Sequence, residues 1–147
     1  MKRIVLLLLA AVVAGASTVS AQGPTKEAVA KALAAIQGTW VIQSINGQSP
    51  ADMGAEMSLT FTDAAYAQTV NGAVDERGTI TIDPSKTPMT IDLTITEGND
   101  AGKVQPGIFE IKDGVMTCKL TFPGETRRPT SLLPEEGFLL FVAKKAK

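Results

Sequence analysis

The sequence contains no histidine and a single cysteine, Cys118. The absence of histidine excludes Ser-His-Asp and Cys-His catalysis, and it excludes sites in which histidine ligates zinc, copper or haem. One cysteine cannot build a thiolate cluster or an intramolecular disulfide, so packing and sheet closure must stabilise the fold. Cys118 alternates with Met116 and Leu120, which predicts a small buried hydrophobe rather than a reactive thiol or an intermolecular bridge.

The sequence also lacks an excess of positive charge and a glycine-rich phosphate loop. Its 14 basic residues face 15 acidic ones, and loss of Lys2 and Arg3 with a leader would leave 12 basic residues and a net charge of −3. Such a chain has no electrostatic reason to bind nucleic acid. The glycines stand singly at turns, which argues against a nucleotide-binding loop.

The first residues are typical of a secretory signal peptide. Lys2 and Arg3 form a basic start, and residues 4–16 form an apolar run too short to span a bilayer comfortably. Small residues up to Ala21 predict cleavage after that position. We therefore expect residues 1–21 to be a signal peptide and residues 22–147 to be one exported domain, periplasmic or extracellular, without a membrane span. A retained N-terminal anchor is the alternative.

The spacing of apolar residues changes at Gly38. Before it, the alanine-rich segment 25–37 has helical spacing and predicts a helix capped by Thr25. After it the period is close to two, which predicts strands at 38–45, 57–62, 65–71, 78–83, 89–96, 104–112, 115–122 and 138–143. So many strands in a short chain leave no room for crossover helices. The sequence therefore predicts an all-β fold, an eight-stranded antiparallel barrel with one short N-terminal helix.

The strand at 89–96 shows the alternation most clearly. Ile91, Leu93 and Ile95 point one way, whereas Asp92 and the threonines point toward solvent. The same alternation predicts an inward face made of Trp40, Ile42, Met57, Leu59, Phe61, Ile80, Ile82, Ile91, Leu93, Ile95, Phe109, Ile111, Met116, Cys118, Leu120, Phe122, Leu139 and Phe141.

The last strand carries a second apolar face, formed by Phe138, Leu140 and Val142. The N-terminal helix is the only other amphipathic element, so we expect it to cover this face from outside the barrel. The long connections at 46–56 and 123–137 are the places where function is expected, because loops carry most binding residues.

Three carboxylate pairs are candidates for acid-base catalysis, since glycoside hydrolysis needs only two such groups. They are Asp83 with Asp92, Asp75 with Glu76, and Glu135 with Glu136. Each pair has a simpler explanation: Asp83 opens a turn, Asp92 is outward on its strand, and the other two pairs lie in polar connections. The oxygen-rich segment 97–100 lacks the regular spacing of a calcium loop and is predicted to be a solvated turn. We therefore expect no catalytic residue and no metal.

Arg127 and Arg128 precede Pro129 in the second long connection. Guanidinium groups bind carboxylates and phosphates through paired hydrogen bonds, so an anion site is one interpretation. The interpretation we favour is structural: one arginine closes the barrel end by packing over Trp40 or by hydrogen bonding to loop carbonyls.

Several segments resemble known families. The opening Gly38-Thr39-Trp40 resembles the G-x-W motif of lipocalins, in which the tryptophan plugs the closed end of an eight-stranded barrel. The chain more closely resembles the lipocalin-like Planctomycetes uncharacterised domain family. The segments that carry this resemblance are I-Q-G-T-W (36–40), D-P-S-K-T-P-M-T-I-D-L-T-I-T (83–96), G-K (102–103), G-I-F-E-I (107–111), M-T-C-K-L (116–120) and R-P-T (128–130).

The resemblance implies a small secreted or envelope-associated bacterial barrel, and the family has no established activity. Phe109 stands where the family usually has tyrosine. Lys144 and Lys145 stand where typical lipocalins have the arginine that stacks on the tryptophan, so Arg128 is the candidate for that stacking role.

These observations together predict an exported, non-enzymatic lipocalin-like domain. We expect it to bind a small apolar or amphipathic ligand at the open end of the barrel, near residues 46–56 and 97–103. The alternative is a filled barrel that serves as a protein-interaction or structural module of the cell envelope, with an envelope protein as its partner. The candidate ligand-binding residues are Trp40, Phe61, Phe109 and Arg128, and no cofactor is expected.

Overall fold

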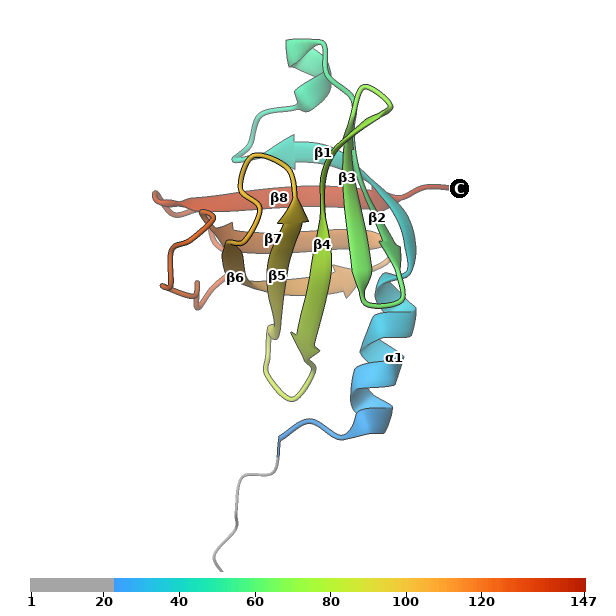
Figure 1. Ribbon diagram of the computed structural model, residues 1–147, viewed down its shortest axis with the longest axis vertical. Helices are drawn as coiled ribbons and strands as arrows, with labels where there is room; N and C mark the ends of the chain where they lie inside the picture. The colour runs from blue at the N-terminus through green and yellow to red at the C-terminus, as the bar shows by residue number, and fades with distance from the viewer. Residues whose placement is uncertain (1–22) are drawn as a thin grey trace, which may run out of the picture.

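The computed structural model describes residues 23–147, so the predicted signal peptide lies outside the described residues. The strands are β1 (Gly38–Ile45), β2 (Met57–Thr62), β3 (Ala65–Val70), β4 (Ala73–Asp83), β5 (Met89–Glu97), β6 (Val104–Lys112), β7 (Val115–Thr121) and β8 (Phe138–Lys145). Each pairs antiparallel with the next, and β8 pairs back with β1 to close the barrel (Figure 1). The predicted fold class is confirmed. Within the described residues, no helix has the length and apolar character needed to cross a membrane.

The helix α1 (Lys26–Ile36) begins as expected, because the Thr25 hydroxyl accepts a hydrogen bond from the Ala28 amide at 3.1 Å. Its position was predicted wrongly. It does not lie against β8 but sits under the closed end of the barrel, where it packs beside β4 (Figure 1). Trp40 Nε1 donates a hydrogen bond of 2.7 Å to the Ile36 carbonyl, which ties the end of α1 to the barrel floor.

The closed half of the barrel is filled with large side chains. Trp40, Phe61 and Phe109 are all buried there in one apolar cluster. Lys145 Nζ lies 5.4 Å from the centre of the Trp40 ring, so Lys145 and not Arg128 supplies the cation over the tryptophan. The predicted inward face is buried or partly buried except at Phe122, which follows the end of β7 and is exposed.

The segment 122–137 between β7 and β8 lies across the outside of the barrel, and we call it the strap. Arg128 fastens it: its guanidinium donates to Asp92 Oδ1 at 2.6 Å, to the Gly107 carbonyl at 2.8 Å and to the Ile91 carbonyl at 3.3 Å. Asp92 therefore points outward as predicted, but it pairs with Arg128. The arginine does bind carbonyls, although these belong to β5 and β6 and not to loops.

The strap also covers part of the second apolar face of β8, the role that the sequence assigned to the helix. Phe138 is buried, with Lys119 Nζ 4.8 Å and the Arg127 guanidinium 4.2 Å from its ring centre. The Lys119 side chain is itself completely buried, and its ammonium donates to Glu135 Oε2 at 2.9 Å. A buried charge needs such a partner, so the ion pair fixes the strap where it crosses β7.

Candidate functional site

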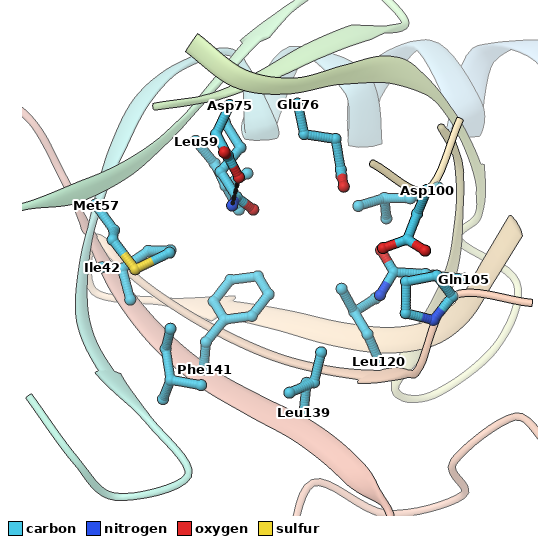
Figure 2. Close-up of a pocket in the computed structure, with 14 residues that line it drawn as sticks. Ile42, Met57, Leu59, Asp75, Glu76, Asp100, Gln105, Leu120, Leu139 and Phe141 are labelled. Atoms are coloured by element: carbon cyan, nitrogen blue, oxygen red, sulfur yellow. Dashed lines mark hydrogen bonds between the residues drawn. The ribbon is translucent and has the colours of Figure 1, made fainter. Parts of the chain in front are cut away.

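The open half of the barrel contains a cavity of about 320 Å³ (Figure 2). This volume lies at the lower end of the roughly 300–1,000 Å³ typical of small-molecule sites. All eight strands contribute to its wall, together with the β5–β6 connection and the strap. The lining residues are Ile42, Ile45, Met57, Leu59, Gln68, Asp75, Glu76, Leu93, Asp100, Gln105, Leu120, Pro123, Leu139 and Phe141. The barrel is therefore filled at one end and hollow at the other.

Two neighbouring acidic residues of β4, Asp75 and Glu76, both line this cavity. Consecutive residues of a regular strand point to opposite faces. Here Glu76 pairs with Gln68 and Val74 pairs with Thr69, so Asp75 has no partner on β3 and forms a β-bulge. Glu76 lies on the inward face of β4 with Gly78, and the bulge turns the neighbouring Asp75 toward the cavity as well, as bulges near binding sites often do. The prediction that this pair lies in a polar connection before a strand starting at 78 is wrong.

The carboxylate of Glu76 is held by Tyr66, whose hydroxyl donates to Glu76 Oε1 at 2.8 Å. Burial and the neighbouring carboxylate raise the pKa of the Tyr66 phenol, so the phenol stays a proton donor. Burial raises the pKa of Glu76, the hydrogen bond from Tyr66 opposes this shift, and the charges of Asp100 and Asp75 add to it. The cavity thus contains a carboxylate whose negative charge is only partly stabilised by the hydrogen bond from Tyr66.

The Tyr66 ring lies over Gly78, its partner on β4. A β-carbon at Gly78 would approach Tyr66 Cε1 to 2.6 Å and collide with the Thr94 carbonyl oxygen. The absence of a side chain at Gly78 therefore gives the tyrosine the space from which it reaches Glu76.

The rim of the cavity is rich in hydrogen-bond acceptors. Asp100 pairs with Lys103 at 2.6 Å, and Asp75 receives a long contact of 3.4 Å from Gln68. In the part of the chain that the structure describes, no lysine or arginine lines the cavity. Within residues 23–147, no three carboxylates or thiols are grouped so that they could hold a metal ion. An apolar floor below an acceptor-rich rim suits an amphipathic organic molecule.

The four candidate ligand-binding residues do not line this cavity. Trp40, Phe61 and Phe109 are buried in the closed half, and Arg128 lies outside the barrel on the strap. The cavity lies at the location expected for the open end, because Ile45 and Met57 flank the segment 46–56 and Asp100 lies within the segment 97–103.

Sequence reasoning missed two polar residues of the site, Gln68 and Gln105, and it named Glu76 only as part of a carboxylate pair in a polar connection. Alternation alone places Gln105 on the same face as Phe109, so the signal was present for that residue. It was overlooked because only apolar residues were assigned to the inward face.

The other chemical candidates have structural roles. Asp83 accepts hydrogen bonds from the Ser85 amide at 2.9 Å and from the Ser85 hydroxyl at 2.6 Å, which confirms it as a turn opener. Cys118 is buried, and burial raises the pKa of its thiol, so the prediction of a buried hydrophobe is confirmed. Glu135 of the strap forms ion pairs with Lys119 of β7 and with Arg127 of the strap.

Comparison with known proteins finds no relative of this chain. The chain matches no family model, and no curated protein or solved structure shows significant similarity to it. The resemblance to the lipocalin-like Planctomycetes family therefore stays a prediction.

Proposed function

We propose that this protein is an exported, non-enzymatic binding protein that holds a small amphipathic molecule in the open half of its barrel. The observation that carries the proposal is the cavity of about 320 Å³, with an apolar floor and a polar rim. The apolar part of the ligand contacts buried side chains such as Leu59, Leu93 and Leu120, and its polar head stays at the rim.

Burial of apolar surface supplies the driving force, at about 25 cal/mol for each Å² removed from water. A preformed cavity adds to this, because the protein does not have to order its wall when the ligand binds. The packed closed half supports the barrel without occupying the open half, so the fold is not filled throughout.

A second candidate function, docking of an envelope protein, is favoured by two side chains of the strap. Phe122 is 41% exposed and Leu133 is 72% exposed. Exposed apolar residues are often interaction sites, but single ones are also common on protein surfaces. The cavity is the more specific feature, and it makes ligand binding the leading proposal.

Calorimetric titration of the purified protein with 1-octanol tests the proposal. Trp40 lies outside the lining, so quenching of its fluorescence would be a poor readout. The substitution Leu139→Trp should fill the cavity and abolish binding. Val142→Trp, on the outer face of the same strand, is the matched control and should bind like the wild type. Absence of any binding by the wild type, or equal binding by Leu139→Trp, would contradict the proposal.

A further inference from the structure

We infer that the head group of the bound molecule is a protonated primary or secondary amine, held at the rim by Glu76 and Gln105. This inference rests on the proposed binding function of the cavity and names the chemical class of its ligand. It follows from the charge of the lining, from one acceptor without a donor on an otherwise buried side chain, and from the arrangement of the carboxylates.

The charge of the lining favours a cation. Asp75, Glu76 and Asp100 are the ionisable residues of the cavity wall, and the basic residue nearest to them in the hydrogen-bond network is Lys103, paired with Asp100. Glu76 has only the hydrogen bond from Tyr66 to its Oε1, and among the described residues nothing donates to Oε2. A carboxylate head group would meet like charges here, whereas an ammonium group would meet opposite ones.

Gln105 gives an independent reason to expect a hydrogen-bond donor on the head group of the ligand. The residue is only 5% exposed, and its Nε2 donates to the Thr121 carbonyl at 3.1 Å, which fixes the orientation of the amide. Its Oε1 accepts no hydrogen bond from the described residues, although Gln105 is part of the cavity wall (Figure 2). An acceptor without a donor, on a side chain that is otherwise buried, favours a ligand that brings an N–H group to it.

The arrangement of the carboxylates favours an organic ammonium over a bare metal ion. A metal ion would need several oxygen ligands around one point. Within the described chain no three such side chains converge in this way. An ammonium group forms separate hydrogen bonds in different directions, so it can use acceptors that are spread around a rim. The apolar wall below the rim, with Leu139 and Phe141, then takes a short hydrocarbon tail.

A series of ligands with one tail and different heads tests the inference. The probes are octylammonium, 1-octanol, octanoate and octyltrimethylammonium, titrated into the purified protein at neutral pH and low salt. Octylammonium should bind about tenfold more tightly than 1-octanol, and octanoate should bind most weakly. Octyltrimethylammonium carries the same charge without an N–H group, so it should bind more weakly than octylammonium.

The outcomes separate this inference from the proposed function. If 1-octanol binds and octylammonium is no tighter, the amine assignment is overturned and the binding function stands. If octyltrimethylammonium equals octylammonium, the N–H contact to Gln105 is overturned. If no octyl compound binds, the proposed function fails together with the inference.

Substitutions locate the effect at the rim. Glu76→Gln removes the charge but keeps an acceptor for Tyr66, and Gln105→Met removes the acceptor at similar length. Each should weaken octylammonium binding by about three- to tenfold and weaken 1-octanol binding by a smaller factor, because the alcohol carries one neutral donor and no charge. The control is Asp113→Asn, which removes one charge in the β6–β7 turn, where a φ of 52° suits asparagine. An equal loss in Asp113→Asn would overturn the inference, because it would trace the preference to net charge.

Discussion

The hydroxyl of Tyr66 donates a hydrogen bond of 2.8 Å to Glu76 Oε1 inside the barrel. Tyr66 comes from β3 and Glu76 from β4, where Glu76 shares the inward face of the strand with Ile80. The pair connects the packed part of the barrel to its hollow part. It places a charged acceptor where a ligand head group would lie.

Replacing Tyr66 with phenylalanine should raise the pKa of Glu76. The hydrogen bond from Tyr66 stabilises the charged carboxylate, whereas burial and the charges of Asp100 and Asp75 destabilise it. Carbon-detected NMR titration of the Glu76 carboxyl in both proteins measures the change. An unchanged or lower pKa in Tyr66→Phe would show that the hydrogen bond does not hold the carboxylate.

Replacing Glu76 with glutamine should increase the free energy of unfolding at neutral pH. The folded protein raises the pKa of Glu76, so the folded state binds the proton more tightly than the unfolded state. The charged carboxylate therefore lowers stability as the pH rises from the unfolded pKa past the folded one. Urea denaturation should show the gain at pH 7 and its disappearance at pH 3.5. Lower stability of Glu76→Gln at pH 7 would contradict this account.

Replacing Gly78 with alanine should destabilise the barrel by about 1–3 kcal/mol, the usual cost of inserting a methyl group into packed surroundings. The new β-carbon would meet the Tyr66 ring and the Thr94 carbonyl. Gly23→Ala is the control, because nothing lies within 4 Å of its β-carbon position. Equal stability of the two variants in urea would show that the close approach of Tyr66 is not required.

Replacing Arg128 with alanine should cost about 1–3 kcal/mol, because the guanidinium makes charged hydrogen bonds to two backbone carbonyls and to Asp92. Arg77→Ala is the comparison. Among the described residues, the Arg77 side chain pairs with the exposed Glu97, and such surface pairs contribute about 0–1 kcal/mol. Equal losses in the two variants would mean that Arg128 does not fasten the strap.

The barrel could be predicted because its strands alternate so regularly. In β5, Ile91, Leu93 and Ile95 are buried as their spacing requires. The start of β4 was missed because the bulge at Asp75 breaks the period of two. A bulge depends on how the neighbouring strand pairs, and one strand's own sequence does not reveal this.

The partners of charged and apolar faces were harder to predict than the faces themselves. Ala32 and Ile36 are the buried residues of α1, and the helical spacing of segment 25–37 did not say which part of the barrel they contact. Lys145 lies over Trp40 because β8 pairs with β1 at that position. Trp40, Phe61 and Phe109 were predicted to bind a ligand, but they are buried together in one apolar cluster, and the cavity lies between other inward residues. Strand register and side-chain packing decide where such space remains, and the spacing along one strand does not show this.

The most direct test of the account is an isotope-filtered NOE experiment on the protein with octylammonium. We expect contacts from the octyl chain to the methyl groups of Leu59, Leu93 and Leu120, which line the cavity, and none to Leu140. Leu140 lines a separate groove outside the barrel with Phe122 and Phe138. Contacts to Leu140 without contacts to the three cavity leucines would place the ligand in that outer groove and contradict the account.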